Sequence, residues 1–144
     1  MKNLTMVLFL LFSFCLSGQE WIGDYKEALS QATANDKLIV LVFAGSDWCA
    51  PCIKLDRNIW QSNEFATYAS ENYIMYKADF PRKKANKLSK EKAEVNGQLA
   101  EKYNPKGYFP LVVILNKGGE VLGTTGYANV SPKEYISLIN SFIK

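Results

Sequence analysis

The residues of this chain best suited to chemistry are two cysteines separated by two residues, Cys49 and Cys52. A thiolate can attack a disulfide sulfur, and a second thiol nearby can then resolve the mixed disulfide that forms. A bridge between these two cysteines would close almost no loop, so it would add little stability through chain entropy. The spacing therefore favours a redox function over a structural bridge.

The segments on either side of the pair predict how it is positioned. Residues 38–43 are apolar, partly β-branched and uncharged, which is typical of a buried strand. After the pair, Cys52, Leu55 and Ile59 recur at helical spacing, so we expect a helix that begins at or just after Cys49. The free N–H groups and the dipole at that helix start would favour a thiolate at Cys49. We expect Cys49 to be exposed and to attack, and Cys52, one turn later on the inward face, to resolve.

The first 18 residues have the pattern of a secretory signal peptide. Lys2 precedes an apolar run over residues 4–16, and two small residues follow it. The run is shorter than the roughly 17–25 residues of a membrane-spanning helix. A retained anchor and lipidation at Cys15 are the alternatives, although the residue before Cys15 is aromatic rather than small. We expect cleavage near residue 18 and a periplasmic or otherwise extracytoplasmic domain, residues 19–144, in an oxidising compartment.

Metal binding is the main alternative chemistry for paired cysteines. The chain has no histidine, and beyond the leader only Cys49 and Cys52 remain, so a zinc site would need two further ligands. Haem attachment needs a histidine where this chain has Ile53, and a copper carrier would find only Met75 for support. The lack of histidine also excludes Cys–His hydrolysis. We expect no metal, and no cofactor apart from the redox-active Cys49–Cys52 disulfide.

The composition is that of one globular domain. Of the 144 residues, 48% are hydrophobic and 22% are charged, which allows one sizeable core and argues against global disorder. The net charge of +3 is too small to imply a nucleic-acid partner. We expect a monomer that binds no nucleic acid.

Helices and strands alternate along the remaining sequence. The patterns predict, in chain order, a helix at 25–34 capped by Asp24, the strand at 38–43, the helix after Cys49, a helix from Ser62, a strand at 73–79, a helix at 92–103 interrupted or weakened at Gly97, a strand at 111–115, a turn at 116–119, a strand at 120–124 and a helix from Ser131. The last helix is expected to bury Tyr135, Leu138, Ile139 and Phe142.

A strongly basic stretch, at about residues 80–94, separates two of these elements. Residues 82–92 hold six lysine or arginine side chains and one glutamate. One interpretation is a patch for an acidic partner protein or an anionic surface. The other is a solvated loop and helix start, which the absence of aromatic residues among the charges favours.

The motif Trp48-Cys49-Ala50-Pro51-Cys52, set between a buried strand and a helix, resembles the active site of the thioredoxin superfamily. Pro110, at the start of the strand at 111–115, matches the cis-proline that this superfamily keeps opposite its cysteines. The resemblance covers about residues 21–144 and is closest to secreted bacterial thioredoxin-like proteins. It implies an α/β fold, a thioredoxin-like three-layer sandwich with a mixed central sheet of about four strands flanked by helices.

The resemblance also implies roles for other residues. Trp48 would shield the pair and offer a flat contact to substrate, or serve core packing alone. The backbone at Phe109, beside Pro110, would pair with an extended substrate segment. Relatives carry a buried carboxylate under the second cysteine where this chain has Phe43, and a smaller residue where it has Phe109. Lys77 matches a lysine near that site and would support proton transfer.

Together these residues predict a thiol–disulfide oxidoreductase. Cys49 and Cys52 would exchange disulfides with extracytoplasmic proteins. No charged side chain lies between the cysteines to stabilise a thiolate strongly, so a reductase fed by a membrane electron donor is favoured over an oxidase. The alternative is a non-enzymatic module that binds peptides or a partner on a thioredoxin-like scaffold.

Overall fold

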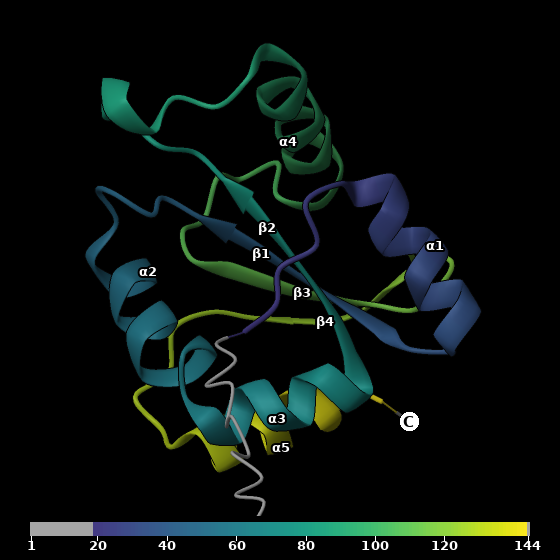
Figure 1. Ribbon diagram of the computed structural model, residues 1–144. Coiled ribbons are helices and arrows are strands. Elements are labelled where there is room, and N and C mark those ends of the chain that lie inside the picture. The colour runs from purple at the N-terminus through teal and green to yellow at the C-terminus, as the bar shows by residue number, and fades with distance from the viewer. Residues whose placement is uncertain (1–18, 144) are drawn as a thin grey trace, which may run out of the picture.

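The computed structural model of this protein describes residues 19–143 (Figure 1). The expected signal peptide lies outside the described residues. In chain order the elements are α1 (Tyr25–Asn35), β1 (Leu38–Ala44), α2 (Ala50–Leu55), the π-helical turn η1 (Asp56–Trp60), α3 (Asn63–Asn72), β2 (Tyr73–Asp79), the 3₁₀ turn η2 (Lys84–Asn86), α4 (Lys90–Tyr103), β3 (Leu111–Leu115), β4 (Val121–Thr125) and α5 (Pro132–Asn140). Within these residues, no helix has the length and apolar character needed to cross a membrane.

The four strands form one mixed sheet in the order β2-β1-β3-β4. β1 pairs parallel with β2, with Leu38 opposite Tyr73 and Ala44 opposite Asp79. β1 pairs antiparallel with β3, and β3 antiparallel with β4. Because β1 and β2 run in the same direction, the residues that follow both strands meet at one edge of the sheet.

Helices cover both faces of the sheet, as Figure 1 shows. Side chains alternate along each strand, so β1 sends Val40 and Val42 to one face and Leu41 and Phe43 to the other. The first face packs against α2, η1, α3 and α5, and the second against α1 and α4. The expected three-layer sandwich with a mixed four-stranded sheet is confirmed.

Side-chain caps fix where the helices begin. Asp24, Ser62, Ser89 and Ser131 each accept a hydrogen bond from the backbone N–H three residues later. At Ser131 the carboxylate of Glu134 also accepts the N-cap backbone N–H, which completes a capping box.

Three details of the helices differ from the sequence predictions. α4 begins at Lys90, two residues earlier than expected, because Ser89 caps it, and it runs unbroken through Gly97. A single interior glycine costs a helix only about 1 kcal/mol, which tertiary packing offsets. In α5, Ile136 is buried, whereas Leu138 and Phe142 lie half-exposed at the rim of the core.

Candidate active site

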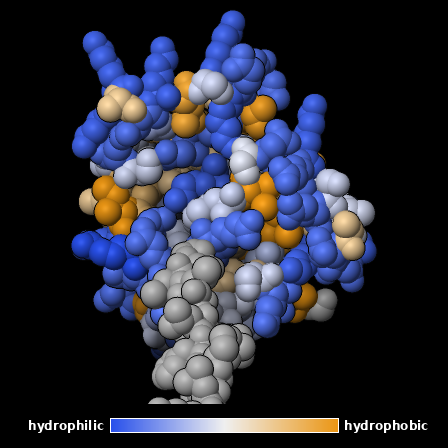
Figure 2. Space-filling view, in the orientation of Figure 1, coloured by the Kyte–Doolittle hydropathy of each residue, from blue (hydrophilic) through white to orange (hydrophobic). Residues whose placement is uncertain are grey.

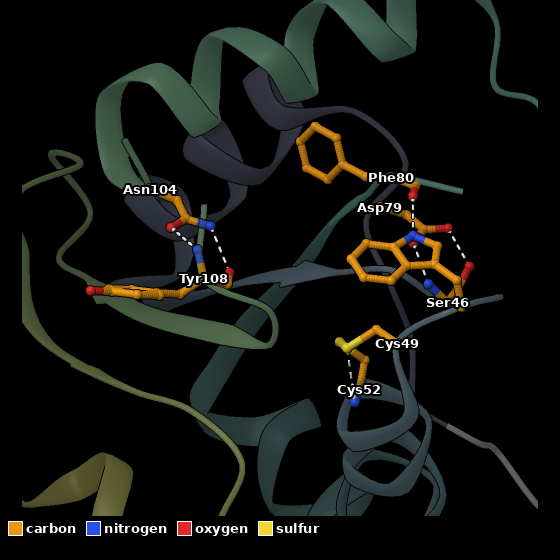
Figure 3. The surroundings of a disulfide bond; sticks show 8 residues. Ser46, Cys49, Cys52, Asp79, Phe80, Asn104 and Tyr108 are labelled. Atoms are coloured by element: carbon orange, nitrogen blue, oxygen red, sulfur yellow. Dashed lines mark hydrogen bonds between the residues drawn. A yellow bond between two sulfur atoms is a disulfide. The ribbon is translucent and has the colours of Figure 1, made fainter. Parts of the chain in front are cut away.

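The two cysteines lie where β1 leads into α2, and a disulfide joins them (Figure 3). Cys49 is the N-cap of α2, and its sulfur accepts a hydrogen bond from the backbone N–H of Cys52 at 3.3 Å. An N–H donor aimed at this sulfur favours negative charge on it once the bridge is reduced. The expected helix start and the inward placement of Cys52 are both confirmed.

The expected exposure of Cys49 is wrong for this disulfide form. Cys49 and Cys52 are each only 4% exposed. Both cysteines belong to the buried core cluster against which Trp48 and Phe109 pack. Residue exposure therefore does not distinguish the two cysteines in this form, whereas the hydrogen bond to the Cys49 sulfur at the N-cap does.

Trp48 is half-buried and held from three directions. Its indole Nε1–H donates to the carbonyl oxygen of Phe80 at 2.7 Å, and its ring meets the ring of Phe109 edge-on at 5.5 Å. The third contact is with Gly45: a Cβ atom at that glycine would stand 2.2 Å from the indole ring. The side chain is thus fixed beside the disulfide by the residues around it.

Phe109 and Pro110 precede β3 and complete the wall around the disulfide. The peptide bond between them is cis, as the sequence predicts. The Phe109 ring contacts Phe80 at 5.5 Å as well as Trp48. Upstream, the buried Asn104 side chain donates to the carbonyl oxygen of Tyr108 and accepts its N–H, at 2.8 and 2.9 Å, which fixes this loop (Figure 3).

Lys77 lies in the site, and it brings a carboxylate that the sequence predictions missed. Its ammonium group contacts Asp56 at 2.9 Å. Both residues line a cavity of about 100 Å³ together with Cys52 and Pro110. A cavity of this size has room for water. Asp56 follows Cys52 by four residues, so helical spacing places the two on one face.

Phe43 does not lie under Cys52, contrary to the sequence expectation. Strand alternation turns Phe43 to the opposite face, where it stacks on Phe80 at 6.5 Å, while its neighbours Val42 and Ala44 line the cavity beside Cys52. The carboxylate near Cys52 therefore comes from the helix rather than from the strand.

Two further carboxylates hold the loop that carries the motif. Asp79, at the end of β2, accepts the backbone N–H of Ser46 at 2.9 Å and its hydroxyl at 2.5 Å (Figure 3). Asp47 accepts the backbone N–H of Arg82 and the side-chain amide of Asn86, both at 2.9 Å. The bond from Arg82 is the larger cause, and together they hold the pKa of Asp47 below its usual value.

All six predicted site residues gather at this end of the sheet. Cys49 and Cys52 are bonded to each other, Trp48 contacts Phe109, and Pro110 and Lys77 share the cavity with Cys52. Among residues 19–143 no group of three or more acidic, cysteine or histidine side chains is arranged to hold a metal ion.

Sequence comparison relates the chain to known proteins. A family model described as thioredoxin-like matches residues 20–117. The disulfide bond reductase DsbH of Chlamydia pneumoniae is 36% identical over 121 residues, which are 84% of this chain and 71% of that protein. The thioredoxin-related protein DsbJ of the same organism is 28% identical over 60 residues, 42% of this chain and 17% of DsbJ.

Solved structures give the same relationship. A structure of a DsbH oxidoreductase matches with a TM-score of 0.81 and 33% identity, over 88% of this chain and 85% of that one. A putative disulphide-isomerase from Bacteroides thetaiotaomicron matches with a TM-score of 0.62 and 22% identity, over 88% and 94% of the two chains. The second similarity concerns the fold alone.

Proposed function

The chain belongs to the thioredoxin-like family and is a thiol–disulfide oxidoreductase, and from that premise we propose that it reduces disulfides of proteins outside the cytoplasm. The observation that carries the proposal is the placement of Cys49 at the N-cap of α2, with the Cys52 N–H directed at its sulfur. In the reduced protein this donor stabilises a Cys49 thiolate, which is the attacking species.

The reaction moves two electrons from the cysteine pair to the substrate. The Cys49 thiolate forms a bond to one substrate sulfur, and the other substrate sulfur leaves as a thiolate. Cys52 then loses its proton and attacks Cys49, which breaks the mixed disulfide and releases the second substrate thiolate. The product is the Cys49–Cys52 bridge seen in the structure. Trp48 and the backbone at Phe109 would hold the substrate segment beside Cys49, next to Pro110.

We assign Asp56 as the acceptor of the Cys52 proton, with Lys77 as its support. The Asp56 carboxylate, the Lys77 ammonium group and Cys52 line one cavity that has room for water, so the proton can cross it through a water molecule. The ion pair keeps Asp56 on the wall of the cavity. Asp56 would thus replace the buried carboxylate that relatives carry where this chain has Phe43.

A reducing direction is supported by what lies between and around the cysteines. Ala50 and Pro51 offer no charge and no hydrogen-bonding side chain, so the Cys49 thiolate lacks the strong stabilisation that makes a dithiol oxidising. The similarity to a protein named a disulfide bond reductase agrees with this direction. After each turnover the bridge must be reduced again, and we assign that step to a membrane electron donor.

We place the mature protein, residues 19–144, in the periplasm or another extracytoplasmic compartment, as a monomer. The signal-peptide pattern of residues 1–18 supports this location. Mass spectrometry of the exported protein should give an N-terminus near residue 19, and an intact Met1 would contradict cleavage.

The test of function is reduction of a protein disulfide such as that of insulin by the purified protein. We expect turnover by the natural protein, none by Cys49→Ser, and a trapped mixed disulfide on Cys49 in Cys52→Ser. Equilibration with glutathione should place the potential nearer the reducing end of the roughly −270 to −120 mV range of such proteins. A value at the oxidising end would overturn the direction, and binding of substrate unaffected by Cys49→Ser and without turnover would indicate a binding module instead.

A further inference from the structure

The basic stretch after β2 forms a groove whose lining combines positive charge with apolar surface. The groove has a volume of about 650 Å³. We call it the cationic groove. Its lining comprises the cations Arg82, Lys83, Lys84, Lys87 and Lys90, the apolar residues Phe80, Pro81, Leu88 and Ala93, and Asp79.

Hydrogen bonds connect the cationic groove to the residue that precedes the redox motif. Asp47, two residues before Cys49, accepts the backbone N–H groups of Arg82 and Lys83 at 2.9 and 3.0 Å and the side-chain amide of Asn86 at 2.9 Å. The Asp47 carboxylate, next to the motif, therefore fixes three residues of the basic stretch.

The wall of the cationic groove continues into the aromatic wall beside the disulfide. The Arg82 guanidinium lies over the Trp48 ring, 3.7 Å from its centroid. The Phe80 carbonyl oxygen accepts the Trp48 indole N–H, and the Phe80 ring contacts Phe109. A polypeptide segment bound along the cationic groove would therefore lead towards the position where a substrate disulfide meets Cys49.

The positive charge of the cationic groove is only partly offset by neighbouring acidic side chains: Asp47 interacts electrostatically with Lys83, and Asp79 lies in the lining. In the described part of the chain, the ion pairs are Lys77 with Asp56 and Lys117 with Asp36, and neither involves a groove cation. The Asp79 carboxylate accepts two hydrogen bonds from Ser46, and the lining sets five cations against this one carboxylate. Figure 2 shows hydrophilic side chains projecting from the end of the molecule that carries α4, with hydrophobic atoms between them.

We propose that the cationic groove docks an acidic segment of the substrate protein, next to the disulfide that Cys49 attacks. This proposal rests on the proposed function and adds the substrate class. Carboxylates of the segment would face the five cations, and apolar side chains between them would contact Phe80 and Leu88. The contribution is mainly to the rate of encounter, so it weakens as salt screens the charges.

The experiment compares peptides that contain one disulfide flanked either by aspartate and glutamate or by serine. The reduced protein should act on the acid-flanked peptide with a kcat/KM at least about tenfold higher at low ionic strength, and the difference should shrink at high salt. The triple variant Lys84→Glu, Lys87→Glu, Lys90→Glu should abolish this preference. These lysines are exposed and avoid the residues that Asp47 fixes.

The matched control changes the net charge by the same amount away from the cationic groove. Lys26→Glu, Lys106→Glu and Lys133→Glu together alter three exposed lysines, and this control should keep the preference for the acidic peptide. Reduction of a small neutral disulfide should be the same in all three proteins, because such a substrate does not reach the groove. That measurement also shows that each variant is folded and active.

The outcomes separate this proposal from the proposed function. If no disulfide is reduced, the proposed function fails. If both peptides are reduced at equal rates, or if the control triple variant loses the preference as fully as the groove variant, the function stands and the cationic groove is not a docking site for acidic segments. Binding of the natural protein, but not the groove variant, to vesicles of anionic lipid, without a peptide preference, would assign the groove to a membrane surface instead.

Discussion

Replacement of Asp56 by asparagine tests the proposal that Asp56 accepts the Cys52 proton. One Asp56 oxygen accepts from the Lys77 ammonium group at 2.9 Å, and the other accepts from the Gln61 side-chain amide. Asparagine keeps the shape of the side chain and one oxygen for Lys77, but it cannot take up a proton. Attack by Cys49 should therefore proceed normally, while attack by Cys52 on the mixed disulfide should slow.

The exposure of the pair sets the expected size of the effect. A positioned general base contributes about 10²–10⁴-fold when the site excludes water. The Lys77 and Asp56 side chains are 24% and 29% exposed, so solvent water can replace the lost acceptor in part. We expect resolution to slow by about tenfold near neutral pH. A partly exposed ion pair contributes no more than about 1 kcal/mol to the free energy of unfolding, so the variant should stay folded.

The assay must separate the two chemical steps. Reduced protein is mixed with a disulfide substrate, quenched in acid at successive times, and analysed by mass spectrometry for the mixed disulfide and for the closed bridge. The other Asp–Lys pair among residues 19–143 supplies a matched control: Asp36→Asn removes a carboxylate that accepts from Lys117, and the Asp36 side chain is 83% exposed and lies outside the site. Asp36→Asn should change neither step. Equal rates of resolution in Asp56→Asn and the natural protein, or an equal slowing of attack and resolution, would refute the role of Asp56.

Three further changes have expected outcomes. Asn96→Ala should lower the free energy of unfolding by about 2–3 kcal/mol in urea titrations, because this fully buried amide bonds the Tyr76 hydroxyl and the Asp79 carbonyl at 2.9 and 3.0 Å; a loss under about 0.5 kcal/mol would contradict this. Gly97→Ala should raise the free energy of unfolding by about 0.5–1 kcal/mol, since a Cβ atom at this position meets nothing within 4 Å. A decrease in the free energy of unfolding would mean that α4 requires the glycine. The pKa of the Asp47 carboxyl is lowered, so its hydrogen bonds stabilise the attached loop fully above the ordinary carboxyl pKa of about 3.9 and are lost as the pH falls through the lower pKa of the folded protein. Backbone amide NMR signals of this loop should therefore titrate with the Asp47 carboxyl in the natural protein, and this titration should be absent in Asp47→Asn.

The order of elements could be predicted because its signals are local. The strand that begins at Leu38 is indicated by a short apolar run, and the helix after Ser131 by a capping residue at a fixed spacing. The cis peptide bond at Pro110 could be predicted because the cysteine motif upstream indicates a superfamily that keeps a cis-proline at this position. Such patterns do not depend on contacts between distant segments, so they can be recognised in the sequence alone.

The polar partners of the site could not be predicted, because they depend on tertiary packing. Asp56, the first residue of η1, lies one helical turn after Cys52. Carboxylates at that spacing are common on helices, and only the approach of Lys77 on β2 distinguishes this one. The buried Asn96 and Asn104 give no sequence signal either, since an asparagine in or just after a helix is usually solvated. The low exposure of Cys49 could not be predicted either, because it depends on the residues that pack around the disulfide in the folded protein.

The parallel pairing of β1 and β2 explains why the basic stretch belongs to the site rather than to the surface around it. The two strands end side by side, with Ala44 opposite Asp79, so the chain leaving β1 towards Cys49 and the chain leaving β2 into the basic stretch start from the same place. Each then binds the other through a carboxylate: Asp79 holds Ser46, and Asp47 holds Arg82. The basic stretch leaves the sheet at this point and is linked to the cysteines, because Asp47, the carboxylate that binds it, lies two residues before Cys49. The proposed docking of substrate in the cationic groove therefore follows from the topology of the sheet as much as from charge.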